Sequence, residues 1–174
     1  QDVEPQKYLI PAHAKKASRI TQFDPHGGVG LAFNGVKMDA PAPVDAILGA
    51  YTLAPFDDCG GHVNPHVGYH YHAITECSSI DTALSTHGKM LGVALDGFTI
   101  FERENPDGQV PDDLDDCGGH TDSDDGYHYH AGAAGSNQIL SCFSAPKGCA
   151  IEGDSMQCDV RRGPLGNRPP PPKP

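Results

Sequence analysis

Residues 57–62 read Asp-Asp-Cys-Gly-Gly-His, and residues 68–73 read Gly-Tyr-His-Tyr-His-Ala. The same two strings return at residues 115–120 and 126–131, so the second block follows the first by a constant 58 positions. With the five residues between the two strings included, the blocks span residues 57–73 and 115–131. Together they hold seven of the ten histidines in the chain. Imidazole is the commonest metal-binding side chain in proteins. The repeat therefore makes a metal site the leading hypothesis.

Upstream of each block lies a β-prone segment with a turn signal at its centre. Residues 29–38 align with residues 91–100 at a constant offset of 62. The aligned segments carry Asn34-Gly35 and Asp96-Gly97 between apolar runs. Such a step predicts a β-hairpin with a two-residue type I′ turn, in which both central residues have φ > 0.

A His-Gly pair precedes each hairpin, at His26 and His87, so a whole unit recurs. The two units span about residues 26–77 and 87–142. Two copies favour a fused pair over a solenoid array. With Gly 21 and Pro 16 among 174 residues, the composition predicts short strands and many turns. The predicted fold is mostly β: two fused, related β-rich halves with pseudo-twofold symmetry, many loops and disulfide bonds.

The predicted domain boundaries follow the repeat. Residues 1–145 form a single domain made of the two units, with an edge strand at residues 8–10. Residues 146–162 form a disulfide-closed C-terminal extension, and the Pro-rich residues 163–174 form an extended or disordered tail. Helical periodicity is scarce. The two short segments that show it are residues 44–51 and 80–84.

Six cysteines predict a disulfide framework, because an even count in such a chain is typical of an oxidising compartment. The preferred pairs close loops locally: Cys59 with Cys77, Cys117 with Cys142, and Cys149 with Cys158. A rival interpretation makes Cys59 and Cys117 zinc ligands, since each stands in a Cys-x-x-His spacing. The chain begins at Gln1 rather than Met, which favours a mature form that has lost a signal peptide. A secreted or periplasmic location is expected.

The charge balance limits the possible partners. The formal net charge is −11 at pH 7. Nucleic acids and anionic membranes bind basic surfaces, so neither is an expected partner. The chain also has no apolar run long enough to span a bilayer. A metal ion is the expected partner, and the oligomeric state is left open.

The Tyr-His-Tyr-His strings predict how imidazoles gather. Alternate side chains of a strand share a face, so His70 and His72 project together, away from Tyr69 and Tyr71. A third ligand, His62, comes from the flexible Gly-Gly segment. The upstream His-Gly histidine is a candidate fourth ligand or a ligand to the site of the opposite half. The same reasoning holds for the second unit. The predicted metal ligands are His26, His62, His70, His72, His87, His120, His128 and His130.

Nitrogen-rich ligation suits copper or zinc better than calcium or magnesium, which prefer oxygen. The acidic pairs beside the cysteines, residues 57–58 and 115–116, are candidate acceptors that orient imidazoles, or ordinary turn residues. Glu76 follows His72 at a spacing used by cupins, but the second unit has Ala134 at the corresponding place. Glu76 is therefore an optional ligand of one site. If the ion is catalytic, the repeated tyrosines are candidates to assist it.

These motifs resemble the YHYH-domain family of secreted bacterial proteins. The resemblance rests on the paired Gly-Tyr-His-Tyr-His-Ala and Asp-Cys-Gly-Gly-His segments and on Leu-Gly-Val-Ala-Leu-Asp-Gly-Phe at residues 91–98, and it covers about residues 26–142. It implies an exported domain and no particular activity. Where relatives often have Gly-Phe-Pro-Ile-Tyr-Gly, residues 97–102 read Gly-Phe-Thr-Ile-Phe-Glu, so this loop is expected to differ.

The leading hypothesis is a secreted protein whose histidine clusters bind copper or zinc, for sequestration, delivery or metal-dependent catalysis. The ions occupy one site in each half or are shared between the halves; the sequence leaves both open, and it leaves enzymatic activity open. The alternative is a non-catalytic adhesion or carbohydrate-binding module. Its histidines would be structural, as members of a satisfied hydrogen-bond network.

Overall fold

The computed structural model describes residues 7–23, 28–49, 56–64, 68–75, 84–152 and 155–158. The protein is mostly β, as predicted, and its described part has one short helix, α1 (Val44–Gly49). The strands are β1 (Lys7–Leu9), β2 (Gly28–Ala32), β3 (Lys37–Asp39), β4 (Gly61–Asn64), β5 (Gly68–Tyr71), β6 (Leu84–Ser85), β7 (Gly88–Ala94), β8 (Thr99–Phe101), β9 (Gly119–Thr121), β10 (Tyr127–His130), β11 (Cys149–Glu152) and β12 (Ser155–Cys158).

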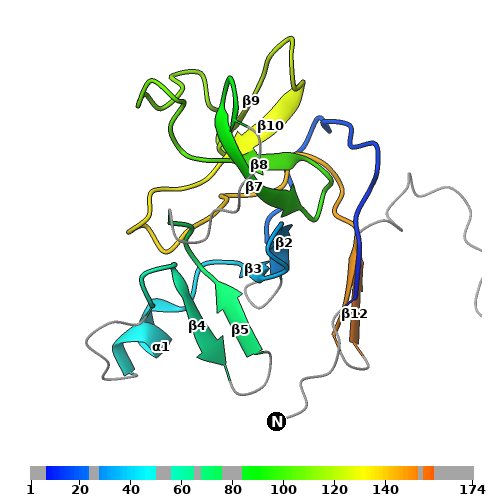
Figure 1. Ribbon diagram of the computed structural model, residues 1–174. Helices are drawn as coiled ribbons and strands as arrows, with labels where there is room; N and C mark the ends of the chain where they lie inside the picture. The colour runs from blue at the N-terminus through cyan, green and yellow to red at the C-terminus, as the bar shows by residue number, and fades with distance from the viewer. Residues whose placement is uncertain are drawn as a thin grey trace, which may run out of the picture.

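The larger sheet is mixed and open, with the order β4-β5-β3-β2-β7-β8-β10-β9, and β6 pairs with β7 (Figure 1). The antiparallel pair β2–β7 joins the two halves at its centre. From this central pair outward, both halves continue in the same order. The hairpin partner, β3 or β8, comes first, and next to it lies a strand parallel to it, β5 or β10. The antiparallel edge strand, β4 or β9, comes last. The two Tyr-His-Tyr-His strands, β5 and β10, therefore hold corresponding places in the strand order. Pseudo-twofold symmetry of the halves stays a prediction.

The hairpins form where they were predicted, but the type I′ turn is wrong. Gly35 and Gly97 have φ of 85° and 95°, whereas Asn34 and Asp96 are not among the positive-φ residues. In the first hairpin the Gly35 N–H donates to the Ala32 carbonyl at 2.9 Å. This is a three-residue loop, in which a tight turn is followed by a left-handed glycine. The Asn-Gly and Asp-Gly steps thus occupy the second and third loop positions.

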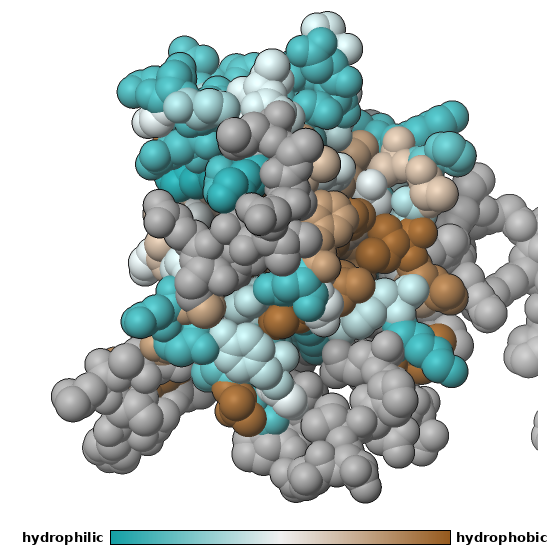
Figure 2. All heavy atoms as spheres, in the orientation of Figure 1, coloured by the Kyte–Doolittle hydropathy of each residue, from teal (hydrophilic) through white to brown (hydrophobic). Residues whose placement is uncertain are grey.

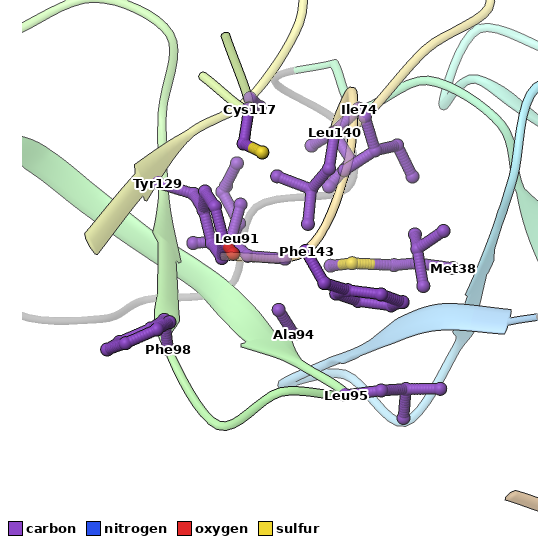
Figure 3. Packing of buried hydrophobic residues seen from close by; sticks show 14 of the residues in the cluster. Met38, Ile74, Leu91, Ala94, Leu95, Phe98, Cys117, Tyr129, Leu140 and Phe143 are labelled. Carbon is purple, nitrogen blue, oxygen red and sulfur yellow. The ribbon is translucent and has the colours of Figure 1, made fainter. Parts of the chain in front are cut away.

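The core lies where the strands of both halves meet the segment that follows β10 (Figure 3). Met38 from β3, Leu91 from β7 and Tyr129 from β10 are buried together with Phe143. These residues come from distant parts of the sequence, so burying them joins the halves into one hydrophobic unit. Removing a buried phenylalanine of this kind costs about 3–5 kcal/mol.

One predicted disulfide, Cys117–Cys142, is confirmed. It ties the turn before β9 to the core segment. Cys59 and Cys149 are also disulfide-bonded; the side chains of their predicted partners, Cys77 and Cys158, lie outside the described part. Cys149 and Cys158 do stand opposite one another in the β11–β12 ladder. The zinc-thiolate interpretation of the Cys-x-x-His spacings is wrong, because a disulfide leaves no thiolate for an ion.

The chain ends of the described region form a separate small sheet. β1 pairs with β11, and β11 with β12, so β1 is an edge strand near the predicted place. The helix predicted at 44–51 is present as α1 over 44–49. Of the helix predicted at 80–84, only Leu84 is described, and it begins β6. The Pro-rich tail lies outside the described residues. No helix in the described part is long and apolar enough to cross a membrane.

Candidate metal centres

The first cluster, called centre one here, consists of His62, His70 and His72. His62 on β4 stands directly opposite His70 on β5 in the antiparallel ladder. The Nε2 atoms of these two rings are 3.1 Å apart. His72 follows on the same face, with its ring centroid 4.7 Å from that of His70. One candidate ligand atom from each of the three lies within 4.8 Å of the others.

The second cluster, centre two, consists of His87, His120, His128 and His130. His120 on β9 stands opposite His128 on β10, and their Nε2 atoms are 2.9 Å apart. His87 comes from the turn between β6 and β7, and its ring lies 4.2 Å from that of His128 between centroids. The four candidate ligand atoms again lie within 4.8 Å of one another.

Backbone carbonyl groups hold the imidazoles of the Tyr-His-Tyr-His strings in one orientation. The first histidine of each string, His70 or His128, donates its Nδ1–H to the carbonyl two residues earlier, at 3.0 and 3.1 Å. The second, His72 or His130, donates to the carbonyl of Ala40 or of Glu102, in each case at 2.7 Å. These bonds assign the hydrogen to Nδ1 and leave the Nε2 lone pair free to bind an ion.

Burial favours the neutral form of three of these rings, those of His72, His128 and His130. Removal from water, helped by the nearby imidazoles and partly offset by the hydrogen bond to a backbone carbonyl, lowers the pKa of His72 and of His130 to about 4 in each case. Burial also lowers the pKa of His128. In centre two, Nε2 of His130 and Nδ1 of His87 are buried without a hydrogen-bond partner. Buried polar atoms are usually paired, so two unpaired nitrogen atoms in one cluster fit a site for a cation.

The Gly-Gly pairs bring the strands of each centre close together. Gly60 and Gly118 have φ of 83° and 84°, and their carbonyl groups accept the N–H of His72 and His130 at 2.9 and 2.8 Å. A Cβ on Gly61 would lie 2.6 Å from the Tyr69 hydroxyl oxygen. Only glycine fits this close approach, which explains why each cluster follows a Gly-Gly pair.

The contacts of Asp57 and Asp115 do not support the predicted role of the repeated aspartates as imidazole acceptors. Asp57 accepts the backbone N–H groups of its own turn and the Tyr69 hydroxyl at 2.6 Å. Asp115 does the same in the second unit, with the Tyr127 hydroxyl at 2.9 Å. Desolvation opposes the shift, but these hydrogen bonds, joined at Asp115 by one from Lys16, lower the pKa of both carboxyl groups. The turn-residue alternative describes these two aspartates.

Sequence reasoning missed the carboxylates that do contact imidazoles. His120 donates its Nδ1–H to Asp113 at 2.7 Å. His87 pairs through Nε2 with Asp122, whose pKa is lowered mainly by the N–H of Asp125 and also by His87. In centre one, Asp39 on β3 lies 3.7 Å from Nε2 of His70. The acidic loops around 112–116 and 122–125 were visible in the sequence, but spacing alone does not say which carboxylate meets a ring.

Aromatic rings border each centre. Phe56 packs against His62 and His72, with centroid distances of 5.4 and 5.3 Å. Phe101 packs against His128 at 5.0 Å. The four tyrosines suggested as helpers point to the other face, where their hydroxyl groups are hydrogen-bonded to Asp57, Asn34, Asp115 and Asp96.

All the predicted ligand histidines that the structure describes fall in one of the two centres. His26 and Glu76 lie outside the described residues. Each centre draws only on its own half, and the two lie toward opposite ends of the larger sheet (Figure 1). Among the described residues, then, the histidines form two sites rather than one shared site.

The family model described as YHYH protein matches residues 7–112 of the chain. The chain belongs to this family. The match includes centre one and His87 but ends before the second Cys-Gly-Gly-His string, whereas the resemblance in the sequence extended to about residue 142. No curated protein and no solved structure gave a significant match. Family membership therefore brings no activity with it, and function rests on the geometry of the two centres.

Proposed function

We propose that the protein binds copper or zinc at its two histidine centres. The observation that carries the proposal is the 2.9 Å separation of Nε2 of His120 and Nε2 of His128. Both rings donate their Nδ1–H elsewhere, to Asp113 and to the Gly126 carbonyl. Both Nε2 atoms then carry lone pairs directed at the same place. Two lone pairs this close repel one another, and a cation between them removes the repulsion.

Copper and zinc suit these ligands best. Zinc bound by imidazole at about 2.0–2.1 Å in a tetrahedron has ligand atoms about 3.3 Å apart. The facing Nε2 atoms of the two centres, at 3.1 and 2.9 Å, need only small shifts to reach that spacing. Imidazole nitrogen also suits copper, whereas calcium and magnesium prefer oxygen.

Holding an ion, for sequestration or delivery, is the function that centre two supports best. Its four imidazoles fill the coordination shell of a tetrahedral ion, as in sites that keep no position open for a substrate. The end of the molecule that carries β9 and β10 is strongly hydrophilic (Figure 2). Its acidic loops attract cations. The disulfide Cys117–Cys142 supports action outside the cytoplasm, in a secreted or periplasmic setting.

The test is the metal content of protein purified without a metal-affinity column. We expect two ions of copper or zinc per chain after exposure to both metals and removal of excess. The double variant His70→Ala, His72→Ala should keep one ion, and His128→Ala, His130→Ala should keep the other. His13→Ala, which removes an exposed histidine outside both centres, serves as the matched control.

The proposal is overturned if the unmodified protein folds normally and takes up neither metal. The histidines are then structural. The non-catalytic adhesion or carbohydrate-binding alternative would then be favoured. Loss of metal in the His13 variant would show adventitious surface binding instead.

A further inference from the structure

An ion pair between a buried lysine and a partly buried aspartate borders centre one. Lys37 on β3 is only 4% exposed, and its Nζ lies 3.0 Å from Oδ1 of Asp39. Lys37 stands beside His70 in the parallel β3–β5 ladder, and Oδ2 of Asp39 lies 3.7 Å from Nε2 of His70. Lysine is rarely buried unless it is paired, and burying an ion pair often costs more than the attraction returns. Such a pair beside a histidine cluster calls for a reason other than stability.

Centre two has other residues at the positions of this ion pair, although the two centres occupy corresponding places in the strand order. At the offset of 62 that aligns the two hairpins, Lys37 corresponds to Thr99 and Asp39 to Phe101. Phe101 packs its ring against His128 and His87, at 5.0 and 5.7 Å. The same strand position is therefore a carboxylate in one half and an apolar cover in the other. The fold itself does not demand Lys37 and Asp39.

The two oxygen atoms of Asp39 face different partners. Oδ1 faces the Lys37 ammonium, and Oδ2 faces the His70 ring. Because His70 donates its Nδ1–H to the Gly68 carbonyl, its Nε2 carries a lone pair. Oδ2 and Nε2 are then two acceptors 3.7 Å apart. That distance is close to the spacing of about 3.3 Å between neighbouring ligands of a tetrahedral ion.

We propose that Asp39 donates Oδ2 to the ion of centre one, which is then bound through nitrogen and oxygen, while centre two binds its ion through nitrogen alone. This inference rests on the proposed metal binding. The ammonium of Lys37 holds the other oxygen and fixes the carboxylate in place. Carboxylate ligands suit harder ions such as Mn²⁺. Centre one is therefore the centre that accepts a wider range of divalent ions, and centre two the one that selects for copper or zinc.

The experiment isolates centre one in the variant His128→Ala, His130→Ala and then adds Asp39→Asn. Affinity is measured by competition against a zinc chelator, and the ligand field by electron paramagnetic resonance of the Cu²⁺ form. We expect at least a tenfold loss of zinc affinity, the least that removing even a supporting carboxylate usually costs. The Cu²⁺ spectrum should shift toward that of a nitrogen-only site. Asp45→Asn, on the exposed face of α1, is the matched control and should change neither.

Two further measurements keep the proposal open to refutation if Asp39→Asn folds poorly. Asp39→Glu keeps the carboxylate and should retain most of the affinity. Mn²⁺ should bind the isolated centre one but not centre two isolated by His70→Ala, His72→Ala. An Asp39→Asn protein with unchanged affinity and spectrum overturns the inference while leaving the metal function intact. An isolated centre one that binds no ion overturns both.

Discussion

Centre one and centre two share one backbone plan and differ in what surrounds it. In both, facing histidines of an antiparallel pair bring their Nε2 atoms to about 3 Å, and the same types of carbonyl group hold the rings. The differences lie at positions outside the repeated strings. Centre one has the largely buried Lys37–Asp39 pair. Centre two has Phe101 in that place, and His87 with its partner Asp122 belongs to it, whereas the corresponding His26 lies outside the described residues. The repeat thus fixes where the histidines gather, and the neighbouring strands set the surroundings of each cluster.

The largest effect is expected from His87→Ala. It removes one of four candidate ligands in centre two, and we expect zinc affinity at that centre to fall more than about 100-fold, beyond the usual effect of a supporting residue. Chelator competition in the His70→Ala, His72→Ala background measures it. The matching test for centre one is His26→Ala in the His128→Ala, His130→Ala background. An equal loss of zinc affinity there would mean that both centres use four imidazoles. Unchanged affinity in the His87 variant would remove His87 from the site.

A smaller loss, about 10- to 100-fold, is expected for Asp122→Asn. Asp122 contacts Nε2 of His87, and Nδ1 of the same ring is buried without a partner. We expect Asp122 to orient His87 for binding through Nδ1. Combined with His87→Ala, the Asp122 change should then add no further loss. An additive effect would show instead that Asp122 binds the ion directly, as proposed for Asp39.

The contribution of the Gly-Gly pairs is testable as stability. Gly119→Ala would place a Cβ 2.6 Å from the His128 carbonyl oxygen. Strain of this kind costs about 1–3 kcal/mol, so urea unfolding of the metal-free protein should shift to lower concentration. Gly61→Ala should cost a similar amount, because its Cβ would lie 2.7 Å from the His70 carbonyl oxygen. Gly135→Ala, with open space around it, is the control. Equal stability of all three variants would show that the close approach is unimportant.

The sequence predicted the histidine clusters because each one is built from local rules. Strand alternation put His70 and His72 on one face, and a hairpin-like return brought His62 opposite His70. The parallel contacts β3–β5 and β8–β10 could not be predicted, since they join strands separated by long connections. Asp39 and Lys37 meet centre one only through such a contact. Their sequence position says nothing of it.

The turn type was wrong for a related reason. Both hairpin signals were correct in place, yet Gly35 takes the third loop position, and φ is not positive at Asn34. The side chains of Asn34 and Asp96 turn back instead, and each meets a tyrosine hydroxyl from the neighbouring Tyr-His-Tyr-His strand. These hydrogen bonds to the tyrosines depend on where β5 and β10 lie. The Asn-Gly and Asp-Gly dipeptides carry no information about the position of those strands.

Asp96 offers the smallest and most selective comparison between the halves, because its counterpart is Asn34. Asp96 is fully buried, and desolvation raises its pKa to about 6, partly offset by hydrogen bonds from Tyr129, Phe98, Ser144 and Ala145. Since its pKa is higher folded than unfolded, the folded state binds this proton more tightly. The stability that it contributes is present at low pH and is lost as pH rises from about 4 to 6, by at most about 1.4 kcal/mol per pH unit.

Asp96→Asn converts this position to the residue found in the first half. The lowered pKa values of His72 and His130 act in the opposite direction, lowering stability as pH falls from about 6.5 to 4, and they remain in both proteins. The difference in unfolding free energy between the metal-free wild type and the variant therefore isolates Asp96. We expect this difference to shift in favour of the variant as pH rises from 4 to 6 and to be constant above pH 7. A difference independent of pH would show that Asp96 ionises as easily in the fold as in the unfolded chain.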